Sequence, residues 1–208
     1  MATELILIAL LLIAGVLVHH FVKKAQARRA YLVIPERFVV FDLETTGLKP
    51  ESHEIIEIGA IRVYRDRTEH DTYQSLIKPK RKIPKKITEI TGITQEMVDA
   101  EGRPISDVLS EFLEFVGSDR LVAFNADFDV AFLNSSLNAY LPSRKIVNPV
   151  SCALKMARKA WPGLKSYKLS ELAKIGSLSG RETHRALADC QRTMIVYGAA
   201  VRATRRAS

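Results

Sequence analysis

Cysteine is scarce in this chain of 208 residues, which contains only Cys152 and Cys190. The sequence has no CxxC pair, so a cysteine-built zinc site is not expected. A single disulfide between the two thiols stays open, but we favour two reduced, partly buried cysteines in a cytosolic domain. Internal repeats and low-complexity segments are also lacking. The length fits one ordinary domain with a short appendage.

Acidic residues are fewer than basic ones, at 23 against 31, which gives a formal net charge of +8 and an isoelectric point near 9.6. A basic surface attracts polyanions, so this composition indicates either nucleic acid or the anionic face of a membrane as a partner. Net charge alone does not decide between them. Hydrophobic residues make up 47% of the chain, which is enough for a sizeable core.

The N-terminal part of the chain contains a long apolar run. Residues 5–18 (LILIALLLIAGVLV) are all apolar or glycine. Counted to Val22, the run is about 27 Å long as a helix, against about 30 Å for the hydrocarbon core of a bilayer. We therefore predict a transmembrane helix over residues 4–22. No basic residue precedes it and several follow from Lys23 onward, so the positive-inside rule predicts a single-pass protein whose main domain faces the cytoplasm.

Two alternatives compete with a membrane anchor. Residues 25–27 (AQA) fit the cleavage site of a signal peptide, but the basic n-region is missing and two lysines separate this site from the apolar run. A buried core helix fits poorly with an unbroken apolar run at the start of a chain. We therefore interpret residues 23–34 as a basic juxtamembrane linker, residues 35–201 as the main domain and residues 202–208 as a basic tail.

The main domain alternates between strand and helix patterns. Short β-branched and aromatic runs predict strands over residues 37–43, 55–63 and 72–77, whose spacing suggests an antiparallel meander. From Ile105 to Val116 the apolar residues recur at helical spacing. The further predicted elements are a strand over residues 121–124, a helix over 127–138, a short strand starting at 146–147, a helix over 153–160 and a last helix over 185–201. Together they predict a mixed α/β sheet covered by helices.

Two acids stand at the end of the first predicted strand. Asp42 and Glu44 are two residues apart, so the period of a strand places both on one face. A carboxylate inside an apolar run is costly unless it is paired or coordinated. Metal-assisted phosphodiester hydrolysis needs several converging carboxylates of this kind. Capping of the following turn is the plainer explanation, and both interpretations stay open for this pair alone.

Further polar residues stand at the starts of predicted helices. Asp129 falls in the first turn of the helix over residues 127–138, where the helix dipole also favours acids. Asp127 is the better candidate for a plain N-cap. His184 lies in the loop before the last helix, and Asp189 lies in the first turns of that helix. A loop histidine that reaches such a site has a natural role as general base for an attacking water.

Taken together, these segments resemble the DEDDh exonuclease superfamily, the DnaQ-like proofreading nucleases. Three motifs carry the resemblance: FDxETTGL at residues 41–48, HNAxFD at residues 124–129 and HRAxxD at residues 184–189. Residues 87–97 (ITEITGITQEM) resemble the ITGIT segment of the family, and residues 166–173 (SYKLSELA) resemble its KLxxLA helix.

The resemblance implies a ribonuclease H-like fold and a 3′→5′ exonuclease that releases nucleoside 5′-monophosphates. It implies two Mg²⁺ or Mn²⁺ ions held by four acids: Asp42, Glu44, Asp129 and Asp189. It also implies that His184 takes a proton from the attacking water. Thr45 and Thr46 match positions that lie against the terminal nucleotide in the family.

Two segments depart from the pattern of the family. Phe124 stands where the second motif usually begins with histidine. This position is not a metal ligand in the implied scheme, so the departure bears on substrate handling and does not exclude catalysis. Residues 149–152 (PVSC) stand where many relatives carry an Asp-Thr pair, which leaves the subfamily undecided.

Basic residues crowd the segment 78–86, between the third predicted strand and the ITGIT-like segment. We interpret Lys80, Arg81 and Lys82 as residues that bind the substrate strand by electrostatic guidance. Two alternatives have equal weight. One is a solvated loop, and the other is contact with anionic lipid head groups, which a membrane anchor would favour.

The function that these patterns and the resemblance predict is removal of nucleotides from 3′ ends, with single-stranded DNA as the substrate. An exoribonuclease or oligonucleotidase on the same scaffold is the first alternative, because the metal site contacts phosphate and contacts to the 2′-hydroxyl decide between DNA and RNA. A membrane-bound nucleic-acid-binding adaptor without turnover, acting with a partner such as a polymerase, is the second.

Overall fold

The computed structural model describes residues 34–175 and 185–206. The chain divides into two units, Met1–Ile34 and Pro35–Ser208, and the described helices and strands belong to the second unit. The predicted anchor (residues 4–22) and all but the last residue of the predicted linker (residues 23–34) lie outside the described residues. In the part of the chain that is described, no helix is both long and apolar enough to cross a membrane.

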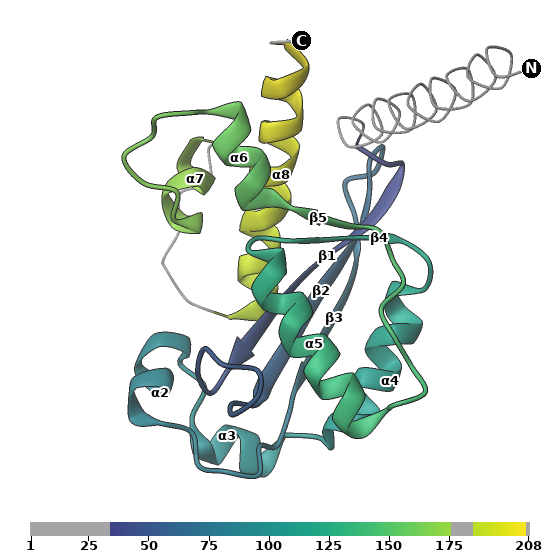
Figure 1. Cartoon of the computed structure of the whole chain (residues 1–208), viewed down its shortest axis with the longest axis vertical. Coiled ribbons are helices and arrows are strands. Elements are labelled where there is room, and N and C mark those ends of the chain that lie inside the picture. The colour runs from purple at the N-terminus through teal and green to yellow at the C-terminus, as the bar shows by residue number, and fades with distance from the viewer. Residues whose placement is uncertain (1–33, 176–184, 207–208) are drawn as a thin grey trace, which may run out of the picture. The chain divides into compact units, whose positions relative to one another are not determined.

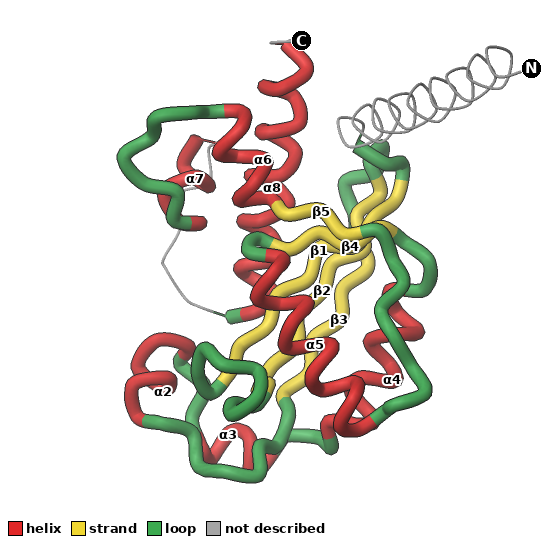
Figure 2. Tube along the Cα trace, in the orientation of Figure 1, coloured by secondary structure: helices red, strands yellow, loops and turns green. Residues whose placement is uncertain are grey.

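One sheet contains five strands in the order β3-β2-β1-β4-β5 (Figure 1, Figure 2). β1 (Arg37–Thr45), β2 (Ile55–Tyr64) and β3 (Asp71–Leu76) pair in antiparallel fashion, which confirms the predicted meander. β4 (Arg120–Ala123) and β5 (Val150–Cys152) continue the sheet beyond β1, each parallel to its neighbour. The sheet is therefore mixed, as predicted, and β1 is its central strand.

Helices cover both faces of this sheet. α4 and α5 share the main core cluster with β1, and Figure 1 shows α5 crossing in front of the strands. α8 packs on β1 and β2, where its Tyr197 lies 5.4 Å from Phe38 between ring centroids. The helices within the described ranges are α2 (Lys85–Thr91), α3 (Gln95–Ala100), α4 (Ile105–Val116), α5 (Ala126–Tyr140), α6 (Ala153–Ala160), α7 (Leu169–Ile175) and α8 (Ala186–Arg206).

The apolar run in β1 is buried on both faces. Phe41 contacts Phe112 of α4, with 5.8 Å between ring centroids, whereas Phe38 contacts Tyr197 of α8. A strand enclosed in this way has a continuous hydrophobic sequence, without the alternation of a half-exposed strand. β1 is therefore a rigid support for the acids at its C-terminal end.

Two sequence predictions about element boundaries are wrong. The strand expected to start at residues 146–147 does not form there, and Val147 is 89% exposed. The strand is β5, whose Val150 pairs with Leu121 of β4, because a strand forms only where its backbone groups find hydrogen-bond partners. The last helix continues past its predicted end to Arg206, so most of the residues that we assigned to a basic tail belong to α8.

Candidate active site

Two acids stand side by side at the C-terminal end of the central strand. Asp42 and Glu44 are partly buried, and the buried Leu43 lies between them. A register shift between Glu44 and Thr45 ends the regular pairing of β1 with β2. The period of a strand puts the two carboxylates on one face, as the sequence predicts.

Asp189 joins this pair from the first turn of α8. One carboxylate oxygen from each of Asp42, Glu44 and Asp189 lies within 4.8 Å of the others. Gly59 of β2 is the cross-strand partner of Asp42, and a Cβ at this position would lie 2.6 Å from the carbonyl carbon of Ala186. The missing side chain therefore lets the start of α8 lie directly on the sheet beside the acids.

Asp129 is the fourth predicted acid and lies in the first turn of α5, where it is 4% exposed. Its charge raises the pKa of Asp42, although it is not among the three acids whose oxygens lie within 4.8 Å. Asp127, two residues earlier, forms an exposed ion pair with Lys155 at 2.7 Å. The prediction that Asp127 caps α5 is wrong, because Asn125 occupies the N-cap position.

Burial and mutual repulsion raise the pKa values of these acids. The pKa of Asp42 lies well above its ordinary value, first because of burial and then because of the charge of Asp129. Burial raises the pKa of Glu44 to about 8, with further contributions from Asp189 and Glu57. Burial also raises the pKa of Asp129 to about 7, against backbone hydrogen bonds that lower it. Near neutral pH this cluster therefore binds either protons or cations.

The donor set suits a hard divalent cation. Mg²⁺ and Mn²⁺ prefer carboxylate oxygens, whereas zinc sites are richer in histidine and cysteine. Among the described residues, no lysine or arginine forms an ion pair with Asp42, Glu44 or Asp129, and the nearby Arg185 is bound to another acid. The oxygens of these three carboxylates thus fit a metal ion, since no described lysine or arginine pairs with them.

That other acid is Glu57, a fully buried residue of β2 to which the sequence analysis gave no role. It is the cross-strand partner of Glu44. Its oxygens accept hydrogen bonds from Arg185 Nε at 3.0 Å, from the backbone N–H of Ala186 at 2.9 Å and from Gln74 Nε2 at 2.9 Å. Glu57 therefore ties the start of α8 to the sheet. An acid within the apolar run of residues 55–63 was the available signal for it.

A basic residue also contacts the cluster from α8. Arg192 Nη1 lies 2.6 Å from Asp189 Oδ1, one helical turn away. The sequence analysis missed this pair, although the i,i+3 spacing of opposite charges on a helix would have predicted it. His184 lies outside the described residues, so its role as general base stays a prediction.

The two threonines after Glu44 hold the loop that follows β1. The hydroxyl of Thr45 donates to the carbonyl oxygen of Gly47 at 2.7 Å, and Thr46 Oγ1 accepts from the backbone N–H of Glu54 at 2.9 Å. Both threonines are buried. Their contact with a terminal nucleotide stays a prediction, and their contacts within the chain fix the loop next to the acids.

The basic segment contacts the same loop. The backbone N–H groups of Lys80 and Arg81 donate to the carboxylate of Glu54 at 3.0 and 3.2 Å, while Lys82 is exposed. Lys85 begins α2, so only part of the segment is a loop. Lys80 and Arg81, two of the three cations that we predicted to bind substrate, are thus attached through their backbone to the loop between β1 and β2.

Phe124, at the position of the missing motif histidine, packs against an apolar cluster of α6, α7 and α8 that includes Ala157, Leu172 and Val196. It contributes packing beside the start of α5. Both cysteines are free, as we favoured over a disulfide, and both are buried where we expected partial burial.

The chain matches known proteins over most of its length. A family model described as Exonuclease matches residues 39–197. The DNA polymerase III PolC-type protein of Clostridium perfringens is 43% identical over 159 residues, which are 76% of this chain but only 11% of that protein. The DNA polymerase III subunit epsilon of Aquifex aeolicus is 40% identical over 161 residues, which are 77% of this chain and 78% of that protein.

Solved structures share the fold. Exonuclease X in complex with 5′ overhanging duplex DNA is 29% identical with a TM-score of 0.62, covering 79% of this chain and 91% of that chain. The zinc-bound complex of E. coli ExoI with single-stranded DNA is 23% identical with a TM-score of 0.67, covering 83% of this chain and 41% of that chain. The second likeness concerns the fold alone. The described residues thus have the ribonuclease H-like fold of these nucleases.

Proposed function

This chain belongs to the exonuclease family of DnaQ-like 3′→5′ exonucleases, and from that premise we propose that its buried acidic cluster hydrolyses the last phosphodiester bond of a nucleic-acid strand. The acidic cluster consists of Asp42, Glu44, Asp129 and Asp189. The observation that carries the proposal is the convergence of three of these acids within 4.8 Å. The product would be a nucleoside 5′-monophosphate.

The acidic cluster would hold two Mg²⁺ or Mn²⁺ ions. When bound, two such ions stabilise negative charge on the attacking and leaving oxygens of the phosphate. The fold brings the carboxylates together and buries them, and this burial raises the pKa values of Glu44 and Asp129. Since no lysine or arginine of the described residues forms an ion pair with these two acids, metal ions would compete with protons for them near neutral pH.

His184 is the residue that we assign as general base. An imidazole with a pKa near its ordinary value of about 6.5 can accept a proton from water at neutral pH. The ion pair between Glu57 and the adjacent Arg185 supports this assignment, because it fixes the chain one residue after the histidine. We assign Thr45 and Thr46 to the binding of the terminal nucleotide, on the resemblance of their motif.

Single-stranded DNA is the substrate that we propose. The solved relative Exonuclease X is a complex with DNA, and the relative from Aquifex aeolicus is a subunit of a DNA polymerase, which together support DNA over RNA. Lys80, Arg81 and Lys82 would guide the strand by charge. RNA ends are the alternative, because carboxylates and metal ions contact the phosphate and leave the sugar unread.

A non-catalytic adaptor is a second candidate function. One observation favours it: the relative from Aquifex aeolicus is a polymerase subunit, which suggests a polymerase as partner.

In either function, the predicted transmembrane helix over residues 4–22 would hold the domain at the cytoplasmic face of a membrane. Fractionation of cells that express the full chain tests this anchor: recovery with the membranes supports it, and recovery in the soluble fraction contradicts it.

The test of the enzyme is degradation of 5′-labelled single-stranded DNA and RNA of matched sequence, with Mg²⁺ or Mn²⁺. A ladder that shortens from the 3′ end supports the proposal if EDTA, Asp42→Ala and His184→Ala each abolish it, and the polymer degraded faster identifies the substrate. Asp127→Ala is the matched control, because this acid is exposed and paired with Lys155. Absence of metal-dependent shortening of both polymers, with 3′ ends still bound, would favour the adaptor.

A further inference from the structure

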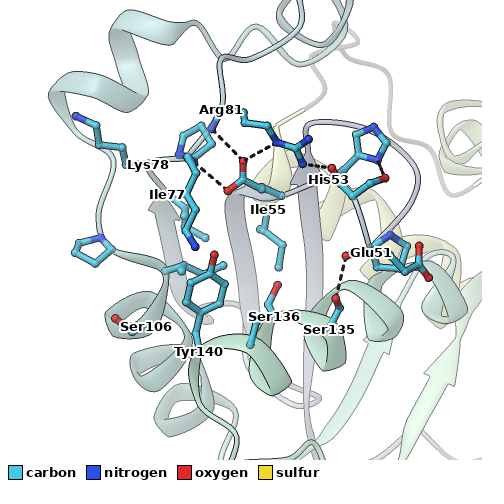
Figure 3. A pocket seen from close by; sticks show the side chains of 18 residues that line it. Glu51, His53, Ile55, Ile77, Lys78, Arg81, Ser106, Ser135, Ser136 and Tyr140 are labelled. Atoms are coloured by element: carbon cyan, nitrogen blue, oxygen red, sulfur yellow. Dashed lines mark hydrogen bonds and ion pairs between the residues drawn. The ribbon is translucent and has the colours of Figure 1, made fainter.

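A cavity of about 490 Å³ lies outside the acidic cluster, beside the loop that follows β1. Figure 3 shows Ser136 and Tyr140 of α5 on one side of it and Ile55, at the start of β2, facing them. A volume of this size is typical of small-molecule sites, which range from about 300 to 1,000 Å³. None of the acids of the acidic cluster lines it.

The lining of the cavity combines three kinds of surface. Ile77 and the ring of Tyr140 supply apolar area and Ser136 supplies a hydroxyl. Lys80 and Arg81 supply positive charge beside two lining acids, Glu51 and Glu54. An aromatic or aliphatic surface with adjacent cations binds single-stranded nucleic acid, because bases stack on it while the cations contact the backbone. The chemistry of the lining therefore matches a nucleotide.

The cationic side of the cavity is held in place by Glu54. The carboxylate of Glu54 accepts from the backbone N–H groups of Lys80 and Arg81 at 3.0 and 3.2 Å and lies 3.9 Å from Arg81 Nε. These contacts offset the charge of Glu54 and fix the turn that carries both cations. The backbone of this turn thus needs little ordering when an anion binds.

Lys80 is the cation that is most available to a ligand. Its Nζ lies 4.9 Å from the ring centroid of Tyr140. Among the described residues no carboxylate forms an ion pair with it, whereas Lys78 pairs with Asp99 at 3.3 Å. A hydrogen bond with Tyr140 raises the pKa of Lys80, so the ammonium stays charged. The ring of Tyr140 and an ammonium that no described carboxylate neutralises thus lie together at the cavity.

Two direct connections join the cavity to the acidic cluster. Thr46 and Glu54 are joined by two hydrogen bonds of 2.9 Å. Thr46 belongs to the motif FDxETTGL and Glu54 lines the cavity, so these bonds connect the motif to the cavity wall. α5 carries both Asp129 and the cavity wall, and at about 1.5 Å per residue Ser136 lies roughly 10 Å and Tyr140 roughly 16 Å along the helix from Asp129. A strand whose 3′ end occupies the acidic cluster reaches the cavity within a few nucleotides.

We propose that this cavity binds an upstream nucleotide of the single-stranded nucleic acid whose 3′ end lies in the acidic cluster. The base packs against Tyr140, and an adjacent phosphate pairs with Lys80 and Arg81. The proposal rests on the proposed function, since the acidic cluster defines where the 3′ end lies. Strands too short to span both sites bind more weakly than strands that fill both.

Equilibrium binding of 5′-fluorescein-labelled DNA to the full chain in EDTA tests the cavity without turnover. Lys80→Glu reverses the charge at the cavity, and Ser136→Phe fills it. Lys85→Glu is the matched control, because this lysine is 93% exposed and does not line the cavity. The probes are a single strand of about ten nucleotides, within the usual size of such sites, and a dinucleotide with the same 3′ end.

Lys80→Glu and Ser136→Phe should weaken binding of the longer strand about tenfold and leave the dinucleotide within about twofold of wild type. Lys85→Glu should weaken the longer strand by less than about threefold. If Lys80→Glu and Lys85→Glu weakened binding of the longer strand equally, the cause would be the overall surface charge and not the cavity. That result would overturn the proposal. Unchanged binding of the longer strand by Ser136→Phe, whose fold is checked by circular dichroism, would also overturn it.

Hydrolysis of the p-nitrophenyl ester of thymidine 5′-monophosphate with Mn²⁺ separates this proposal from the proposed function. The ester has no upstream nucleotide, so Ser136→Phe should hydrolyse it at the wild-type rate. A wild-type chain that binds DNA in the expected pattern but does not hydrolyse the ester or DNA would contradict the proposed function and leave the cavity as a nucleic-acid site. Equal losses on the ester and on DNA in Ser136→Phe would contradict the cavity proposal.

Discussion

Glu44 and Glu57 are cross-strand partners on the neighbouring strands β1 and β2. Glu57 has no exposed surface, and its oxygens accept hydrogen bonds from Arg185, the backbone of Ala186 and Gln74. Glu44 is also withdrawn from water, yet within the described ranges no ion pair is formed with it, and burial raises its pKa to about 8. The two acids therefore share their chemistry and location and differ in the donors around them.

This difference separates an acid that holds the fold from acids that are available to a ligand. Glu57 is satisfied by groups of the protein, so its burial is offset within the chain. Glu44, with Asp42 and Asp129, is left for a cation from outside, and its burial costs stability until that cation binds. Substitutions at and around these two acids test this difference.

The largest expected effect is the loss of catalysis when Glu44 or Asp189 loses its charge. Glu44→Gln and Asp189→Asn keep the size of the side chain and remove a ligand charge. The value of kcat should fall on the order of 10³-fold, because several kcal/mol of transition-state stabilisation are lost. Degradation of single-stranded DNA at saturating Mn²⁺ measures it. The control Asp127→Asn should keep kcat within about twofold of wild type. Near-normal activity of Glu44→Gln would show that Glu44 is no more important for catalysis than a structural acid such as Glu57.

The next effect is on stability, on the side of Glu57. Glu57→Ala should lower the free energy of unfolding by about 3 kcal/mol, because it leaves the guanidinium of Arg185 and the N–H of Ala186 without their acceptor. Glu44→Ala should not lower the stability of the metal-free protein, since it removes a repelling charge. Urea unfolding in EDTA compares the two variants. Equal destabilisation by both would show that the two acids are satisfied alike.

A smaller effect is expected from Gly59, where α8 lies directly on the sheet. Gly59→Ala should cost about 1–3 kcal/mol of unfolding free energy and lower kcat, because its Cβ would lie 2.6 Å from the backbone of Ala186 and push Asp189 away from Asp42. Gly198→Ala is the control within α8, because its Cβ would meet only the flexible side chain of Arg202 at 3.3 Å. Thermal unfolding and DNA degradation measure both variants. A Gly59→Ala enzyme with wild-type kcat would contradict this account of the helix start.

The last test is the pH dependence of stability without metal. The pKa of Glu44 is raised from 4.5 to about 8 and that of Asp129 from 3.8 to about 7, so between these values the folded protein keeps protons that the unfolded chain has released. The Tm in EDTA should therefore fall as the pH rises from about 5 to about 8. Mn²⁺ should reverse the loss most strongly at the upper end. A metal-free Tm that rises across this range would contradict the raised pKa values.

Sequence reasoning succeeded where the signal was local. The apolar run and both acids of β1 lie within residues 38–44, so strand, burial and facing carboxylates could be predicted together. Glu57 has the same local signature, an acid within an apolar strand. It is set apart by Arg185, 128 residues away in the chain, and that contact could not be predicted from the strand itself.

Apart from the local pair of Arg192 and Asp189, the misplaced and missed features depend on partners that are distant in sequence. β5 has only three residues, and its position is set by pairing with β4. The cavity is lined from separate loops and from α5, and no local pattern brings Tyr140 to Lys80. Lys80 and Arg81 were recognised as cations, but their attachment to Glu54 required the fold.

The central proposal is that Asp42, Glu44 and Asp129, with which no lysine or arginine of the described residues forms an ion pair, hold metal together with Asp189. Calorimetric titration of Mn²⁺ into the metal-free full chain at a pH of about 8 tests it most directly, with Glu44→Gln and Asp127→Asn measured beside the wild type. The account predicts saturable binding of two ions, weakened about tenfold or more in Glu44→Gln and unchanged in Asp127→Asn. Absence of saturable binding, or equal affinity in wild type and Glu44→Gln, would contradict it.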